Sequence, residues 1–210
     1  MSKHFVSNKD ESPRIFKNNF LDLVSRVHWS TPLILYIPFT LFLLYQAIFV
    51  YALNALTIIG LFFGGMLFWS FAEYVLHRFV FHYQPPGKWG ERLHFVAHGV
   101  HHDYPNDSKR LVMPPALSLI FCVVFWFIYT STLGYAYTMA FFPGFVVGYL
   151  MYDMTHYALH HANIKHPIFQ KLKEHHMIHH YSHPEKGFGV SSTLWDIIFR
   201  SGYPKKKANS

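Results

Sequence analysis

Two long stretches of the chain, residues 27–72 and 111–152, contain no lysine, arginine, aspartate or glutamate. Leucine, isoleucine, phenylalanine, valine and tyrosine dominate both stretches. A helix that crosses a bilayer needs about 20 mostly apolar residues, so each stretch has room for two spans and a tight turn. Two buried hairpins in a soluble core are the alternative, but a soluble domain of this size rarely leaves so much sequence uncharged. The pattern therefore predicts an all-α integral membrane protein with four transmembrane helices in two hairpins.

Local signals place the ends of these helices. Thr31 followed by Pro32 is typical of a helix start, and Asn54 marks the turn of the first hairpin. Gly144 and Gly148 lie in the last span, where small residues allow two helices to approach closely. The predicted spans cover approximately residues 33–52, 56–76, 115–132 and 135–153.

The charged residues set the topology. The chain has 18 lysines and arginines against 11 acidic residues, a formal net charge of +7. The basic residues lie before, between and after the two hairpins, whereas the turns near residues 54 and 133 carry none. The positive-inside rule places these flanks in the cytosol and explains the charge without nucleic acid as a partner. We expect residues 1–26 to form a cytosolic tail or an interfacial helix, and 27–210 to form a single membrane-embedded domain.

Histidine is the most informative residue type in the composition. Seventeen of the 210 residues are histidine, and they avoid the predicted spans. Most of them gather in two polar segments, residues 77–102 and 156–183, both on the predicted cytosolic side. The only cysteine, Cys122, excludes a disulfide framework, a zinc ribbon and a cysteine-ligated iron–sulfur site.

The spacing of ten of these histidines suits metal ligation. Pairs three and four residues apart share one face of a helix. His77 and His82 are five residues apart, about 140° on an ideal α-helix, so the helix must end or distort there if both bind at one site. The candidate ligands are His77, His82, His98, His101, His102, His156, His160, His176, His179 and His180.

Ten imidazoles are too many for one ion and predict two metals. Neutral imidazole suits iron, zinc, copper and nickel. A structural zinc site is saturated by four ligands, whereas histidine-rich shells with open positions suit dioxygen chemistry. We also expect nearby side chains to hydrogen-bond to the ligand rings and orient them, although Asp103 could equally be a helix cap or a surface charge. These candidates are His94, His161, His175, Asp103, Asp153 and Glu174.

The histidine motifs resemble a known family. The patterns H-x4-H, H-x2-H-H, H-x3-H and H-x2-H-H beside paired spans are similar to those of the fatty acid hydroxylase superfamily of membrane-bound di-iron enzymes, and within it most closely to the fatty acid 2-hydroxylases. The resemblance covers about residues 65–200 and rests on the stretches 71–82, 94–115, 152–161, 171–181 and 187–192. It implies that the ten histidines bind metal in a cytosolic helical cap and that the enzyme hydroxylates C2 of a long acyl chain.

The resemblance also implies cofactors and partners. They are two iron ions, with zinc expected to compete for the sites during purification, together with dioxygen, membrane lipid and a long-chain acyl substrate, either a free acid or a sphingolipid acyl group. Many eukaryotic members carry an N-terminal cytochrome b5 domain. Only about 26 residues precede the first hairpin here, too few for such a domain. We therefore expect a separate electron donor of the cytochrome b5 or ferredoxin type, and a location in the endoplasmic reticulum of a eukaryote or the inner membrane of a bacterium.

Other activities remain open at this point. Sterol or carotenoid oxidation and lipid desaturation occur in the same superfamily and would use a similar metal site. A metal transporter or a membrane haem carrier would need polar ligands within the spans, which hold no histidine or carboxylate near their centres. For an acyl substrate we expect an apolar cleft from the spans to the metals, with walls at Trp69, Phe79, Phe81, Phe145 and Tyr149.

Overall fold

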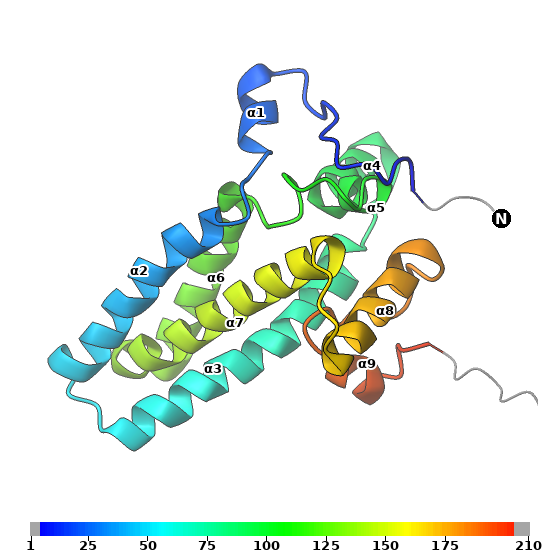
Figure 1. Ribbon diagram of the computed structural model, residues 1–210. Helices are drawn as coiled ribbons and strands as arrows, with labels where there is room; N and C mark the ends of the chain where they lie inside the picture. The colour runs from blue at the N-terminus through cyan, green and yellow to red at the C-terminus, as the bar shows by residue number, and fades with distance from the viewer. Residues whose placement is uncertain (1–4, 204–210) are drawn as a thin grey trace, which may run out of the picture.

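The computed structural model of the protein describes residues 5–203 and contains only helices over that range, which confirms the predicted all-α class (Figure 1). Residues 1–4 of the predicted tail and the basic run at 205–207 lie outside the described residues. The helices are α1 (Asn19–Val24), α2 (Thr31–Tyr45), α3 (Ala55–Leu76), α4 (Gly87–His94), α5 (Val100–Asp103), α6 (Pro115–Leu133), α7 (Tyr135–His161), α8 (Pro167–Tyr181) and α9 (Leu194–Ile198), with short π-helical segments η1 (Gln46–Val50), η2 (His77–Phe81) and η3 (Phe95–Gly99).

Three helical segments of the described chain are long and apolar enough to cross a bilayer. They are Thr31–Val50, Ala55–Phe81 and Pro115–Leu133, and they match the first three predicted spans. The fourth predicted span forms the first part of α7, which packs against α2, α3 and α6 and is largely buried by them. Its passage across the bilayer stays a prediction.

Glycines allow α3 and α7 to pack closely along their length. A Cβ atom on Gly144 would overlap the backbone carbonyl oxygen of Phe62, and one on Gly148 would lie 2.6 Å from the Cβ of Trp69. The two backbones therefore touch at Gly144, and the Trp69 side chain fills the space at Gly148, so neither position leaves room for a larger residue. The close helix contact predicted for these glycines is confirmed.

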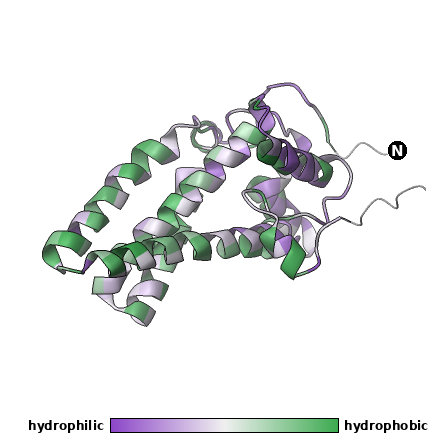
Figure 2. Ribbon diagram, turned by 60° about the horizontal axis from the view of Figure 1, so that its bottom comes forward, coloured by the Kyte–Doolittle hydropathy of each residue, from purple (hydrophilic) through white to green (hydrophobic). Residues whose placement is uncertain are grey.

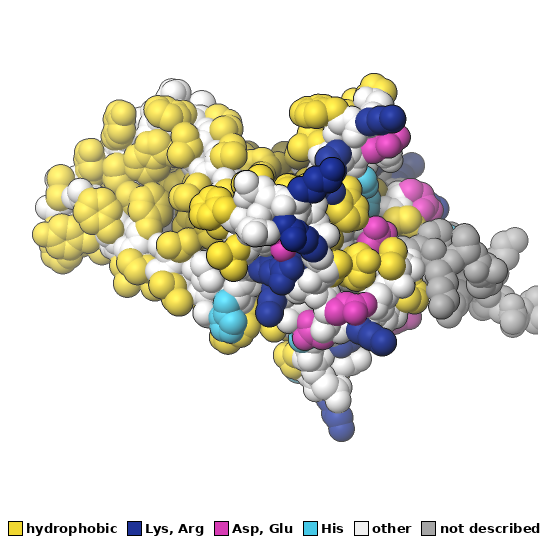
Figure 3. Space-filling view, turned by 90° about the horizontal axis from the view of Figure 1, so that it is seen from above, with side chains coloured by type: hydrophobic (Ala, Val, Ile, Leu, Met, Phe, Trp, Pro, Cys, Tyr) yellow, Lys and Arg dark blue, Asp and Glu magenta, His cyan; other side chains and the backbone are white. Residues whose placement is uncertain are grey.

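The molecule has an apolar end and a polar end (Figure 2). Large apolar side chains on α2, α3 and α6, such as Leu41, Phe63 and Phe127, are exposed, as expected of a surface that faces lipid. Seen from above, hydrophobic side chains cover this end, while the charged side chains gather at the other (Figure 3). We call the polar end, formed by α4, η3, α5, α8 and α9, the cap.

The segment before α2 lies on the cap. The backbone N–H groups of Val6 and Ser7 donate hydrogen bonds to the carbonyl oxygen of Asp103, at 2.8 and 3.1 Å. Closer to α2, the buried Arg110 forms an ion pair with Asp22, which lies in the short helix α1. These contacts tie the described part of the predicted tail to the polar end of the bundle.

Candidate metal centre

Ten histidines converge where α3 and α7 enter the cap. They form two groups of five, and in each group one potential ligand atom per residue lies within 4.8 Å of all the others. The first group is His77, His82, His98, His102 and His179, and the second group is His101, His156, His160, His176 and His180. The structure thus brings together all ten candidates from the sequence, and their role as metal ligands stays a prediction.

A π-helical turn brings His77 and His82 together. The N–H of His82 donates to the carbonyl oxygen of His77 at 3.1 Å, five residues back, and closes the wider turn of η2. The two Nε2 atoms consequently lie 3.2 Å apart, although on an ideal α-helix the side chains would diverge by about 140°. The helix distortion predicted from the spacing is confirmed.

Each H-x-x-H-H motif contributes to both groups. In the first motif His98 and His102 belong to the first group, whereas His101 belongs to the second. The motif in α8 does the reverse, because only its middle histidine, His179, belongs to the first group. The two groups are neighbours, with the ring centroids of His102 and His180 4.4 Å apart. The three histidines of each motif therefore divide between the two groups, although they share one helix face.

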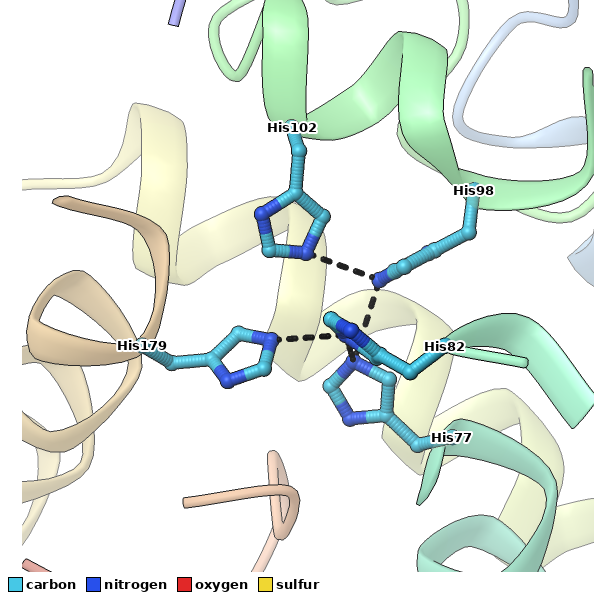
Figure 4. A group of neighbouring side chains, drawn as sticks. All are labelled: His77, His82, His98, His102 and His179. Carbon is cyan, nitrogen blue, oxygen red and sulfur yellow. Dashed lines mark hydrogen bonds between the residues drawn. The ribbon is translucent and has the colours of Figure 1, made fainter. Parts of the chain in front are cut away.

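Fixed tautomers show that the first group suits a cation. Nδ1 of His77 donates to the carbonyl oxygen of Phe188 at 2.6 Å, and Nδ1 of His179 donates to that of Lys186 at 2.7 Å. Each neutral ring then presents a lone pair on Nε2. His82 Nε2 lies 3.2 Å from the first of these atoms and 3.0 Å from the second, and it has at most one proton to donate (Figure 4). At least two lone pairs therefore face each other, and a metal ion at their centre would remove that repulsion.

The nitrogen spacing also suits a metal shell. Imidazole nitrogens bind such ions at about 2.0–2.1 Å, so ligands 90° apart lie about 3.0 Å from each other and tetrahedral ligands about 3.4 Å. His98 and His102 have their Nε2 atoms 3.1 Å apart in the first group. In the second group His176 Nε2 lies 3.0 Å from that of His160 and 3.1 Å from that of His180. These spacings lie in the range expected of imidazole nitrogens that share one ion.

Burial keeps these rings neutral, which is the form that binds metal. Burial, together with neighbouring imidazoles, lowers the pKa of His98, His102 and His180 well below the ordinary value, and lowers that of His156 to about 3. Neither ring nitrogen of His156 has a hydrogen-bond partner, and Nε2 of His101 has none either. Buried polar atoms are rarely left unpaired in proteins. A bound cation would supply the missing partner in the second group.

The profile of the fatty acid hydroxylase family matches residues 62–201, a range that contains both histidine groups. The chain belongs to the fatty acid hydroxylase family. The dihydroceramide fatty acyl 2-hydroxylase FAH1 of Arabidopsis thaliana is 38% identical over 90% of this chain and 79% of its own length. The fatty acid 2-hydroxylase of Mus musculus is 34% identical over 92% of this chain and 57% of its own length. The chain is also similar to the solved structure of scs7p, in which only the hydroxylase domain is visible. The match covers 91% of this chain and 73% of the scs7p chain, with a TM-score of 0.84 and 35% identity.

Two buried carboxylates of this fatty acid hydroxylase, which the histidine spacing does not reveal, hold the loop that orients the first group. Asp196 accepts hydrogen bonds from the N–H groups of Phe188 at 3.0 Å and Gly189 at 2.8 Å. Glu73 accepts one from the N–H of Val190 at 2.8 Å. The loop carries the carbonyl groups that bind two rings of the first group. Both acids interrupt apolar sequence, a signal of burial that was available from the sequence.

The residues expected to orient the ligand rings make other contacts. Asp153 is buried and accepts a hydrogen bond from the N–H of Met113 at 3.3 Å, and His175 Nε2 lies 3.1 Å from a carboxylate oxygen of Asp196. Within residues 5–203, no hydrogen bond joins any of these side chains to one of the ten imidazoles. The set is His94, Asp103, Asp153, His161, Glu174 and His175, of which His161 and Glu174 are exposed.

The fatty acid hydroxylase has two small cavities near the histidine groups, an apolar one and one that Arg110 and Asp153 also line. Trp69, Phe145 and Tyr149 line a small cavity between α3, α6 and α7. Phe81 lines the next cavity, which reaches histidines of both groups. Phe79 is exposed and lines neither cavity. Four of the five expected wall residues therefore face the predicted cleft.

Replacing Asp196 with asparagine should loosen the loop and weaken metal binding at the first group. Burial raises the pKa of Asp196, but hydrogen bonds, the strongest from His175, outweigh this and leave the pKa below its ordinary value. An asparagine would replace one carboxylate oxygen with an NH₂ group, which cannot accept a hydrogen bond from the N–H groups of Phe188 and Gly189. We expect metal affinity to fall by about 10–100-fold and the free energy of unfolding to fall by roughly 1–3 kcal/mol, measured by metal titration and thermal unfolding.

The matched control is Asp103→Asn. The carboxylate of Asp103 is partly exposed, and its contact with the N-terminal segment uses the backbone carbonyl, which the substitution retains. We expect metal affinity and stability close to those of the unmodified protein. Equal losses in the two variants would show that Asp196 has no special role in the loop.

Proposed function

We propose that the protein is a membrane-bound di-iron monooxygenase that hydroxylates C2 of long-chain fatty acids or of the fatty acyl groups of sphingolipids. One observation carries the proposal: two adjacent groups of five histidines lie in a chain that is similar over most of its length to fatty acid 2-hydroxylases. Members of the superfamily that oxidise sterols or carotenoids, or that desaturate lipids, would be distinguished by their products.

The reaction explains why a metal centre is needed. One atom of dioxygen enters the C2–H bond and the other leaves as water, which consumes two electrons and two protons. Protein side chains cannot oxidise an alkyl C–H bond, so the two irons would supply that chemistry when bound. The histidines would hold the ions, and aromatic rings packed on them would keep water away. Phe81 stacks on His98 with ring centroids 5.7 Å apart, and Phe188 packs on His82 at 5.4 Å.

The cofactor and partners follow from this chemistry. We propose iron in both groups, with zinc as a competitor during purification because imidazole binds both metals. The two electrons of each turnover would come from a separate donor of the cytochrome b5 or ferredoxin type. The lipid substrate would be either a free long-chain acid or a ceramide-type acyl group.

The proposed setting is a membrane with the cap on the cytosolic side. Four spans would place all the basic flanks on that side. Exposed apolar side chains on α2, α3 and α6 support insertion of those helices in a bilayer. The membrane would be the endoplasmic reticulum in a eukaryote or the inner membrane in a bacterium.

Anaerobic purification followed by metal counting and a product assay tests the proposal. We expect two irons per chain and, with a reduced donor and dioxygen, a 2-hydroxy product. Parallel assays with a free long-chain acid and with a ceramide identify the acyl form. An alkene, a hydroxyl group at another carbon, or a protein that binds one ion per chain would contradict the proposal.

A further inference from the structure

Three cavities follow one another from the histidines into the bundle. The inner cavity is lined by His98, His101, Met113 and other residues beside both groups. The middle cavity shares Met113 with the inner one and also reaches Cys122. The outer groove shares Cys122 with the middle cavity and has a volume of about 770 Å³. Residues shared between neighbours place the three cavities in a row from the histidine groups toward the lipid-facing surface, and the middle cavity, at about 20 Å³, is the narrowest of them.

The outer groove is a lateral opening between α2 and α6. Both helices pack on α7, and their few contacts with each other leave a gap whose floor is the buried Phe142. Exposed apolar side chains, including Phe42 of α2 and Phe127 of α6, form its walls. At the end nearer the cap, Tyr36 donates a hydrogen bond to Ser118 at 2.8 Å and ties the two helices together. No charged side chain lines the groove.

The path is long compared with one leaflet of a bilayer. His156 lines the inner cavity and Met139 lines the outer groove, and both lie on α7. At 1.5 Å per residue these positions are about 26 Å apart along the helix. One leaflet of a hydrocarbon core is about 15 Å thick. The path therefore suits an acyl chain longer than those of ordinary membrane lipids.

We propose that the outer groove binds the distal part of the substrate's acyl chain, with C2 in the inner cavity, and that the junction at Cys122 limits the length of chain accepted. This rests on the proposed function, because C2 must reach the histidine groups. Apolar lining without charge selects hydrocarbon. Its place in a row with a cavity lined by candidate metal ligands distinguishes this groove from a surface that only borders bulk lipid. The narrow middle cavity is the point that a long chain must widen.

Substituting Cys122→Trp tests the path by filling the junction. We expect a medium-chain saturated acid to remain a substrate and a very-long-chain acid to lose at least about tenfold in relative rate, because a hydrophobic pocket discriminates by this much for small changes in fit. Val124→Trp is the matched control, since Val124 lies on the same helix, is exposed and lines none of the three cavities. An unchanged preference in the Cys122→Trp variant would overturn the proposal.

Thiol labelling of the unmodified protein provides a second test that does not depend on folding of a variant. Cys122 is the only cysteine of the sequence, so N-ethylmaleimide reports on this junction alone. In the absence of dioxygen, a very-long-chain acid should slow labelling at least fivefold, while a medium-chain acid should leave the rate unchanged. Equal labelling rates with the two acids would contradict the proposal and indicate that the groove holds only bulk lipid.

These tests distinguish failure of the groove proposal from failure of the proposed function. If the unmodified enzyme makes a 2-hydroxy product but its chain-length preference and labelling are indifferent to the junction, the groove proposal fails and the function stands. If no 2-hydroxy product forms, the function fails, and selective protection of Cys122 by the longer acid still supports acyl binding in the groove.

Discussion

Replacing His180 with alanine is expected to abolish hydroxylation and to reduce the metal content from two ions per chain to one. His180 is almost fully buried in the second group, and its Nε2 atom lies 3.1 Å from that of His176. Removal of a group that only supports a ligand lowers metal affinity or activity by about 10–100-fold, so loss of the ligand itself should exceed about 100-fold. Metal analysis by mass spectrometry and the 2-hydroxy product assay measure both effects.

His183→Ala is the control for this prediction. His183 is exposed, lies just beyond α8 and contacts the carboxylate of Glu185 at 3.2 Å. It belongs to neither histidine group, so metal content and activity should be unchanged. If the His180→Ala protein keeps two ions and full activity, the second group is not a metal site.

Replacing Gly144 with leucine is expected to separate α3 from α7 and to destabilise the whole protein. The new Cβ would overlap the backbone carbonyl of Phe62, which cannot move unless the helix moves with it. Overpacking of this kind lowers the free energy of unfolding by about 1–3 kcal/mol and occasionally by more. Because α3 leads to His77 and α7 carries His156, activity should fall with the folded fraction. Thermal unfolding and size-exclusion chromatography in detergent measure the loss.

The corresponding change at Gly60 should have little effect. No atom lies within 4 Å of a Cβ placed on Gly60, although it belongs to the same helix as Phe62. A leucine there would extend into open space on the lipid-facing surface. Similar stability of the two variants would show that the close contact at Gly144 does not hold the helices together.

Local patterns were enough to predict the long apolar helices and the candidate ligands. A bilayer requires an uninterrupted apolar segment, so the uncharged stretches predicted the first three spans to within a few residues of the helical segments observed. Spacing of three and four residues is a property of a single helix, so it identified the histidines that converge. The five-residue spacing of His77 and His82 also revealed the distorted turn.

Contacts between distant segments could not be predicted in this way. Spacing cannot tell to which of the two histidine groups a given histidine belongs, because that depends on how η3, α5 and α8 are placed against each other. The bond from Val190 to Glu73 joins residues more than a hundred positions apart, and no local pattern encodes it. Burial of the first part of α7 among three other helices likewise depends on tertiary packing.

α3 continues into η2 without a break, so a helix that can cross the bilayer leads directly to the first histidine group. A segment apolar enough to cross a bilayer, Ala55–Phe81, itself includes His77, and His82 follows it directly with no linker. The first histidine group therefore lies at the membrane boundary, and a lipid can reach it without being extracted into water. Extraction into water would cost about 0.8 kcal/mol for each methylene exposed. This cost grows with the length of the acyl chain, so a site at the membrane boundary gives the greatest advantage to the longest chains.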